Sequence, residues 1–232
     1  MNFSWSATRA PGANHNSTAY NTALNIFACP SDGNWNSVKS NGGVNLNNYF
    51  ASMGTSAYST SGVGAAVTGL FGYQTKVTVA SVTDGTSNTV AFSEGLVGDR
   101  NQLAKVRANS TGNAPAGSPT GNQQYDVSAI AGAVQAEIRT CNNTFTTTNT
   151  NNDRGYRWGA GLLGYSMFNT LVGPNGGGLA NFNSCRIGCC SQAAHAHYVL
   201  ASSNHPGGVN VMMADGSVRF IKNTISLPTW WA

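Results

Sequence analysis

The clearest alternation of hydrophobic and polar positions in the chain lies between residues 209 and 221. Apolar residues there recur at every second position, which is the period of a strand with one buried face. The apolar positions with this spacing are Val209, Val211, Met213, Val218 and Phe220. The pattern predicts a C-terminal β-hairpin whose two strands direct these side chains into the core.

Turn-forming residues divide this hairpin and precede it. Asp215-Gly216 separates the two strands, and a type I′ turn favours this dipeptide because both central residues need a positive φ. Pro206-Gly207-Gly208 ends any earlier element and allows a sharp entry into the first strand. The sequence therefore predicts a two-residue turn at Asp215-Gly216.

Two segments have the pattern of short helices. Apolar residues at the spacing of one helix face predict a helix over 127–138. A second helix is expected to begin at Asn16 or Ser17 and to end near Phe27. The apolar run 26–29 also fits a strand, and it is too short to decide between the two structures.

The rest of the chain alternates between strand-like segments and loops rich in Gly, Asn, Ser and Thr. The expected strands are 46–53, 76–82, 89–92 and 196–201. The expected loops are 34–46, 54–66, 99–124 and 142–153. No linker or internal repeat divides the chain, so we expect residues 1–232 to form a single domain. The predicted fold class is α+β and β-rich, with an antiparallel sheet, few short helices and long loops.

Composition narrows the setting in which such a domain works. Charged residues make up 9% of the chain, against about 25% in typical soluble domains. Hydrophobic residues make up 41%, which is enough to build a core. A surface this neutral and polar suits a secreted protein. The net charge of +4 comes from scattered residues without a basic run, so nucleic acid is not an expected partner.

The cysteines suggest an oxidising compartment. The five are Cys29, Cys141, Cys185, Cys189 and Cys190. We expect at least one disulfide among the last four, because secreted domains use cysteine in this way. Adjacent Cys189 and Cys190 are not expected to bridge each other. The alternative is a zinc site, because the cysteine cluster is followed by His195 and His197, and zinc accepts both ligand types.

Catalytic candidates are few. A hydrolase would use His205 with Asp215 and take Ser202 or Ser203 as its nucleophile. No Gly-x-Ser-x-Gly motif supports this alternative, and the turn explains Asp215. We therefore expect His205 to bond loop backbone near the start of the hairpin, and we expect no enzymatic activity.

One loop offers oxygen ligands for calcium. Asp84 and Asn88 lie in it, but a calcium site needs about six or more oxygens. Asp215, Asp32 or Glu94 would have to supply the others. The alternative is an Asx turn in which Asp84 and Asn88 bond the backbone. No other cofactor is expected, because the sequence contains no phosphate-binding loop or cofactor fingerprint.

Several short motifs follow one another along the chain. The first is Cys-Pro-Ser-Asp, and the second, Thr-Asp-Gly-Thr-Ser-Asn, is followed by a glutamate. The pairs Trp158-Gly159 and Pro174-Asn175 come next, and the last motif is a histidine followed by nine residues and then Asp-Gly. The motif residues are Cys29, Pro30, Asp32, Asp84, Gly85, Asn88, Glu94, His205, Gly207, Gly208, Asp215 and Gly216.

In their order and content these motifs resemble a large family of prepilin-like proteins of unknown function that is abundant in planctomycete bacteria. The resemblance implies export and a pilin-like globular domain, and it implies that Cys29 is the buried, reduced cysteine. It implies no catalysis. The chain shows neither the apolar N-terminal prepilin helix nor the short C-terminal tail of that family. Membrane association is expected only through such a helix.

Together these patterns predict a non-enzymatic, exported structural or assembly subunit at the cell surface. We expect it to form a homo-oligomer or filament through sheet edges and loops, because few charges guard its strand edges. The first alternative is an extracellular module that binds a glycan or a peptide through its loops. The second is the hydrolase that would use His205 and Asp215.

Overall fold

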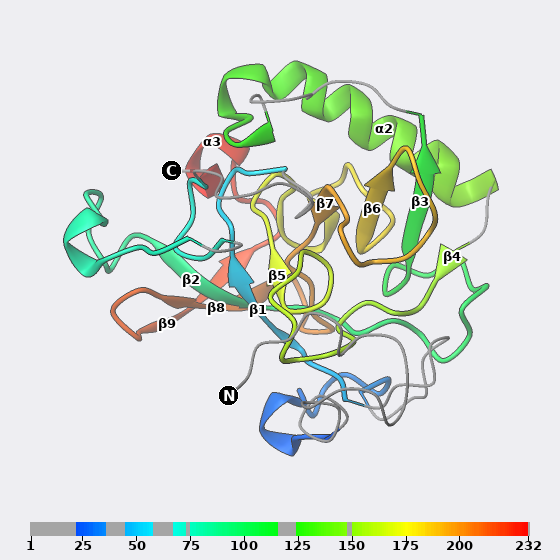
Figure 1. The fold of residues 1–232 in the computed structure, drawn as a ribbon, viewed down its shortest axis with the longest axis horizontal. Helices are drawn as coiled ribbons and strands as arrows, with labels where there is room; N and C mark the ends of the chain where they lie inside the picture. The colour runs from blue at the N-terminus through cyan, green and yellow to red at the C-terminus, as the bar shows by residue number, and fades with distance from the viewer. Residues whose placement is uncertain are drawn as a thin grey trace.

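The strands form two sheets in the computed structural model (Figure 1). The structure describes residues 22–35, 45–57, 67–72, 75–115, 124–147 and 150–231. The strands are β1 (Tyr49–Ser52), β2 (Val90–Glu94), β3 (Ser110–Ala114), β4 (Thr150–Asn151), β5 (Met167–Phe168), β6 (Ser184–Ile187), β7 (Tyr198–Val199), β8 (Gly208–Met213) and β9 (Val218–Lys222). One sheet has the order β5-β1-β2-β8-β9, and the other has the order β4-β3-β6-β7.

Most neighbouring strands are antiparallel, but each sheet contains one parallel pair. These pairs are β1 with β5 and β3 with β6. The helices are α2 (Ala131–Thr147) and α3 (Leu227–Trp231), and the 3₁₀ turns are η2 (Asn25–Phe27), η3 (Val79–Ser81), η5 (Ser128–Ile130) and η6 (Pro174–Gly176). The predicted α+β class is confirmed, with mixed rather than purely antiparallel sheets.

A first hydrophobic core lies between α2 and the four-stranded sheet (Figure 1). Val134, Ile138, Cys141 and Phe145 project from one side of α2 and are buried. The ring of Phe145 meets that of Phe182 edge-on, with 6.5 Å between the ring centroids. The apolar spacing that predicted a helix is therefore the spacing of this contact face.

A second core lies under the inner face of the five-stranded sheet. Val209, Val211 and Met213 of β8 pack there with Phe50 of β1 and Trp230 of α3. The opposite face of this sheet is directed outward, and it carries the candidate site described below.

β8 and β9 form the predicted hairpin, but only part of its apolar set lies in the core. Val209, Val211 and Met213 are buried as predicted. Val218 is 67% exposed and Phe220 is 48% exposed, so the predicted burial of these two residues is wrong.

The turn explains the difference. Met213 N–H donates to the Ser217 carbonyl at 2.8 Å, so three residues rather than two separate the paired positions. Gly216 takes the left-handed conformation that the third residue of such a loop requires, with φ 85°. The additional residue sets Met212 opposite Val218. Because successive side chains alternate between faces, this one-residue shift turns Val218 away from the core.

α2 extends well beyond the predicted helix at 127–138. The predicted loop over 142–153 is wrong, because this segment contains the end of α2 and β4. The Thr144 hydroxyl donates to the Thr140 carbonyl at 3.0 Å, so the polar side chains bond within the helix. Burial of Phe145 outweighs the weak helix propensity of the Asn and Thr residues around it.

The strand predictions are confirmed in part. β1 and β2 lie at the predicted segments 46–53 and 89–92, whereas β7 covers only two residues of 196–201. Segment 76–82 is not a strand, because it contains η3 with its capping box. β3 lies within 99–124, which the sequence predicted as loop.

Other predictions fall largely outside the described residues. Of the helix expected from Asn16 or Ser17, the structure describes only the end, where η2 occupies the range that also fitted a strand. Most of the loops at 34–46 and 54–66 also lies outside. Within the described ranges, no helix combines the length and the apolar character needed to cross a membrane.

Candidate functional site

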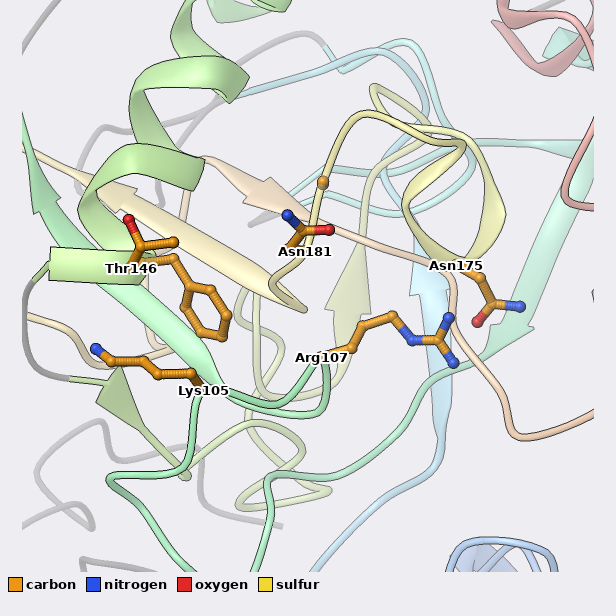
Figure 2. A pocket seen from close by; sticks show the side chains of 7 residues that line it. Lys105, Arg107, Thr146, Asn175 and Asn181 are labelled. Carbon is orange, nitrogen blue, oxygen red and sulfur yellow. The ribbon is translucent and has the colours of Figure 1, made fainter.

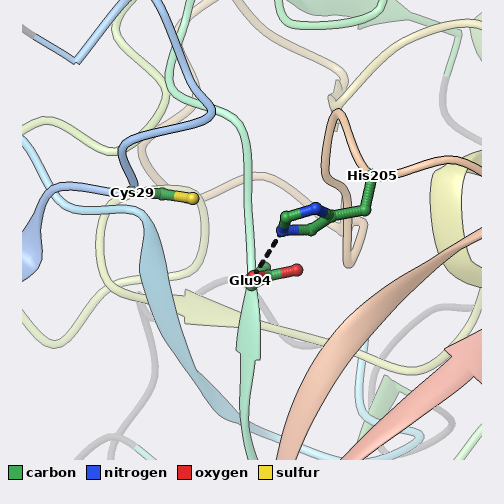
Figure 3. A group of neighbouring side chains, drawn as sticks. All are labelled: Cys29, Glu94 and His205. Atoms are coloured by element: carbon green, nitrogen blue, oxygen red, sulfur yellow. Dashed lines mark hydrogen bonds and ion pairs between the residues drawn. The ribbon is translucent and has the colours of Figure 1, made fainter.

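Cys29, Glu94 and His205 lie side by side although they are far apart in the sequence (Figure 3). Their donor atoms are a sulfur, a carboxylate oxygen and an imidazole nitrogen, and all three lie within 4.8 Å of one another. The distance from His205 Nε2 to Glu94 Oε1 is 3.2 Å. In the part of the chain that the structure describes, no other cysteine, histidine and acidic side chains gather in this way. We refer to these three residues as the Cys–Glu–His cluster.

β8 holds the Glu94 carboxylate in place. Glu94 is the last residue of β2 and is 8% exposed. The backbone N–H of Asn210 donates to Oε2 at 2.8 Å, and its side-chain amide donates to Oε1 at 3.0 Å. The pairing of β2 with β8 therefore orients the carboxylate and shields it from water.

Cys29 reaches the cluster from the turn that follows η2. Its backbone N–H donates to Asn48 Oδ1 at 2.9 Å, and its sulfur lies 3.0 Å from the Ser31 hydroxyl. Cys29 is buried and is the one cysteine outside a disulfide, as the sequence led us to expect. Because Asn48 immediately precedes β1, the five-stranded sheet also positions the sulfur.

Asp32 supports this turn and does not join the cluster. It is 1% exposed. Its Oδ2 accepts from the Asn48 amide at 2.7 Å and from Val97 N–H at 2.9 Å, and its Oδ1 accepts from Asn34 N–H at 3.0 Å. The Asp32 carboxylate thus ties the Cys29 turn to the strands on either side.

His205 lies in the loop before β8. Its backbone N–H donates to the Ser203 hydroxyl at 3.1 Å, and this hydroxyl donates to the Gly208 carbonyl at 2.8 Å. The prediction that its imidazole bonds loop backbone is wrong, because the partner of the ring is Glu94. The His205 side chain is 35% exposed, so the cluster opens to solvent on this side.

Tyr49 stands beside the same cluster at the start of β1. Its register partner across the sheet is Glu94. Burial, together with the neighbouring Cys29 and Glu94, raises the pKa of the Tyr49 phenol. The phenol therefore stays neutral and is available to donate a hydrogen bond.

The structure does not bring His205 and Asp215 together. They lie beyond opposite ends of β8, and Asp215 accepts from the Ser217 hydroxyl at 2.7 Å and from its N–H at 2.9 Å. These bonds lower the pKa of Asp215. The buried Ser202 hydroxyl donates to Asn183 Oδ1 at 2.8 Å. These residues therefore lack the arrangement that the hydrolase alternative requires.

The calcium candidates Asp84, Asn88 and Asp215 lie on two loops that contact each other. The backbone of Asp215 donates to the Thr86 carbonyl at 3.1 Å, which joins the two loops. The side-chain amide of Asn88 donates to the Asp84 carbonyl at 3.1 Å, as expected for a turn. Among the described residues, Asp84 and Asp215 do not gather with a third acidic side chain.

The disulfide prediction is confirmed by Cys141 and Cys185, which join α2 to β6. The structure also joins Cys189 to Cys190, so the expectation that these neighbours do not bridge is wrong. The chain bends at 188–189, where this cysteine pair begins. With all four sulfurs in disulfides, the zinc alternative at this cysteine cluster has no thiolate ligand.

A hollow of about 590 Å³ lies elsewhere, between the end of α2 and the loop before β3 (Figure 2). Lys105 lies over the Phe145 ring, with Nζ 5.8 Å from the ring centroid. Arg107 donates to the Ser203 carbonyl at 3.2 Å, and Asn175 Oδ1 accepts from Ser203 N–H at 2.9 Å. These two hydrogen bonds hold the loop that precedes His205.

A family relationship is shown by comparison with known proteins. Residues 2–227 match the model of the family described as Protein of unknown function (DUF1559). The chain belongs to this family. No curated protein and no solved structure matches the chain. The DUF1559 match covers the whole Cys–Glu–His cluster, and the family description names no activity, so function has to be inferred from geometry.

Sequence reasoning named Cys29, Glu94 and His205 separately and did not bring them together. The sequence did contain a signal for a metal-binding cluster. These three residues supply sulfur, carboxylate and imidazole in motifs made mostly of turn-forming residues. The missing information was the pairing of β2 with β8, which no local pattern in this DUF1559 chain encodes.

Proposed function

We propose that this DUF1559 chain is a non-enzymatic, exported structural subunit that associates with copies of itself at the cell surface. The observation that carries the proposal is the exposed edge of the five-stranded sheet. The pilin-like relationship suggested by the motif resemblance belongs to the same proposal.

β9 forms this edge and carries exposed apolar side chains. In the described part of the chain, no strand pairs with its outer side. Val218 is 67% exposed and Phe220 is 48% exposed. An edge strand with unpaired backbone groups is a template for pairing with another chain. Arg219 and Lys222 are the charged residues of β9, and both side chains are long enough to bend away from a partner.

The apolar surface continues from this edge across the outer face of the sheet. Phe92 of β2 is opposite Met212 of β8, which is opposite Val218 of β9. Phe71 covers Phe92, with 5.0 Å between the ring centroids, and is itself 37% exposed. Contiguous exposed apolar surface marks interaction sites on soluble proteins. A second copy that presents the same surface would bury both the β9 edge and the apolar outer face of the sheet.

Two further observations support export and a structural role. The buried Cys141–Cys185 disulfide suits an oxidising compartment such as the cell exterior. The candidate catalytic hydroxyls and Asp215 are bonded within the fold. Both observations favour a stable surface domain over a hydrolase.

Sedimentation velocity at micromolar concentrations tests the proposal. The wild-type chain should form dimers or larger species, and its interface should bury at least about 1,000 Å². The double variant Val218→Thr/Phe220→Lys removes the exposed apolar edge and adds a charge to it. We expect the variant to dissociate at least about tenfold more readily than wild type, because a charge on an edge strand opposes pairing.

Leu103→Lys is the matched control. Leu103 is 61% exposed and lies in the loop before β3, away from β9. This change removes a similar apolar side chain and adds the same charge, so association should be unchanged. A wild-type chain that stays monomeric, or a control that weakens association as much as the β9 variant, would contradict the proposal.

A further inference from the structure

The donor atoms of the Cys–Glu–His cluster converge on one point. In a tetrahedral zinc site, metal–ligand bonds of about 2.0–2.3 Å set the ligand atoms roughly 3.3–3.7 Å apart. His205 Nε2 and Glu94 Oε1 are already 3.2 Å apart, and the Cys29 sulfur lies within 4.8 Å of a ring nitrogen of His205 and of a carboxylate oxygen of Glu94. Small side-chain rotations therefore suffice to place all three around one ion.

We propose that Cys29, Glu94 and His205 bind a zinc ion. Zinc accepts thiolate sulfur, imidazole nitrogen and carboxylate oxygen, which is the donor set present here. Calcium and magnesium are disfavoured because they need a shell made of oxygens. The Cys29 thiol binds as a thiolate, so its proton is released to solvent when the ion binds.

Hydrogen bonds around the cluster orient the ligands before any ion binds. Asn210 donates to both oxygens of Glu94, at 2.8 and 3.0 Å. Asn48 holds the backbone of Cys29 at 2.9 Å. Partners of this kind fix ligand direction in metal sites and contribute strongly to affinity. All of them belong to the five-stranded sheet or its flanking loops, so the site is built into the fold.

Burial is uneven around the cluster, and this leaves a path for the ion. Cys29 is 7% exposed and Glu94 is 8% exposed, whereas the His205 side chain is 35% exposed. An ion can enter beside the imidazole, and water can take the fourth position there. Three protein ligands and one open position are the arrangement of zinc sites that exchange a ligand.

A thiol–imidazole–carboxylate relay would need a different geometry. In a relay the imidazole stands between its partners, with the carboxylate on one ring nitrogen and the nucleophile on the other. Here Glu94 contacts Nε2 of His205, and the Cys29 sulfur lies 3.0 Å from the Ser31 hydroxyl. Convergence on a common point favours a metal site.

Calorimetric titration of the metal-free full chain with zinc chloride tests the inference. Non-reducing buffer keeps the other four cysteines in disulfides, so Cys29 is the available thiol. We expect one zinc ion per chain and a higher melting temperature in its presence. Cobalt(II) in place of zinc should give a thiolate-to-cobalt charge-transfer band.

Cys29→Ser should abolish the charge-transfer band, and His205→Gln should weaken zinc binding more than about 100-fold. His205 is partly exposed, so its variant keeps the test valid if the buried Cys29 variant fails to fold. His195→Asn is the matched control, because asparagine tolerates the positive φ of 61° at that position. It should bind zinc like wild type.

Three results would overturn the inference: no saturable binding, binding unchanged in both cluster variants, or an equal loss in His195→Asn. Zinc binding is measured on the chain whatever its state of association. Its failure would therefore leave the self-association proposal standing, and a monomeric chain that binds zinc would leave the metal site standing.

Discussion

Two adjacent charged residues, Asp153 and Arg154, have no exposed surface. The Arg154 guanidinium lies over the Phe50 ring, 3.7 Å from its centroid, and donates to the Leu200 carbonyl at 2.9 Å. Burial lowers the pKa of Arg154 to about 9, so the residue stays protonated at neutral pH. A cation–π contact and a carbonyl thus hold this charge between β1 and β7.

Asp153 is in the opposite situation. Its carboxylate accepts from Ala193 N–H at 2.7 Å and from the Tyr165 hydroxyl at 3.4 Å. Burial nevertheless raises its pKa from 3.8 to about 6. The folded state therefore holds this proton more tightly than the unfolded state does. Its contribution to stability is fully present below pH 3.8 and is lost as the pH rises to about 6.

Asp153→Asn should remove this pH dependence. The asparagine oxygen can still accept from Ala193, and the side chain carries no charge to bury at neutral pH. The difference in unfolding free energy between variant and wild type should therefore shift in favour of the variant by about 2 kcal/mol between pH 4 and pH 7. Urea unfolding at several pH values measures this difference, and a constant difference across the range would contradict the prediction.

His197 makes the variant more informative. Burial, helped by Arg186, lowers its pKa from 6.5 to about 4. As the pH falls, His197 is protonated in the unfolded state at a higher pH than in the folded state. The free energy of unfolding therefore decreases as the pH falls from 6.5 towards 4. In the wild type, this loss of stability on acidification is opposed by the stability gained when Asp153 is protonated. In Asp153→Asn only the loss remains, and acid should destabilise the variant more steeply.

At the scale of elements, the contact between α2 and the four-stranded sheet includes a covalent link. Cys141 on α2 and Cys185 on β6 are both fully buried and 44 residues apart in the chain. The register of β6 sets Cys185 opposite Tyr198 of β7, whose hydroxyl donates to Glu137 of α2. The disulfide and this hydrogen bond therefore hold the same helix face.

Removing the long-range disulfide should be costly. Closing a loop of this length in the unfolded chain is worth about 4 kcal/mol in the chain-entropy model. Cys141→Ala/Cys185→Ala should lose that amount, with a further cost from the cavity in the core. Thermal unfolding without reductant measures the loss.

Cys189→Ser/Cys190→Ser is the matched control. It also removes two cysteines, but the bond between neighbours closes almost no loop. We expect its stability to stay close to that of wild type. Equal losses in the two double variants would contradict the assignment of the stabilisation to the α2–β6 link.

At the scale of the whole molecule, charge sets the conditions for association. The chain carries a net charge of +4 at neutral pH, and the proposed contact strand contributes Arg219 and Lys222 to it. Two copies that meet through β9 bring these like charges together. An apolar contact opposed by such repulsion should depend on ionic strength.

Added salt should therefore strengthen self-association. Raising sodium chloride from about 0.05 M to about 0.5 M shortens the screening length several-fold, which reduces the repulsion between copies. Sedimentation at both concentrations should show a larger associated fraction at high salt. A smaller fraction at high salt would instead indicate that ion pairs hold the copies together.

The sequence alone determined those features that depend on neighbours in the chain. Alternation with a period of two located β8 and β9, strand-like segments between turns located much of β1 and β2, and apolar residues at helical spacing located the first half of α2. These periods follow from backbone geometry, which acts over a few residues. Composition and cysteine usage likewise predicted at least one disulfide among four cysteines, and the structure has one that joins α2 to β6.

The tertiary structure decided the rest. One additional residue in a turn placed Val218 and Phe220 on the exposed face. Successive side chains of a strand alternate between its faces, so a shift of one residue reverses the face of every residue that follows. The pairing of β2 with β8 brought Glu94 to His205, 111 residues later in the chain. Such pairings depend on how distant segments close loops and pack, so the Cys–Glu–His cluster exists only in the folded protein.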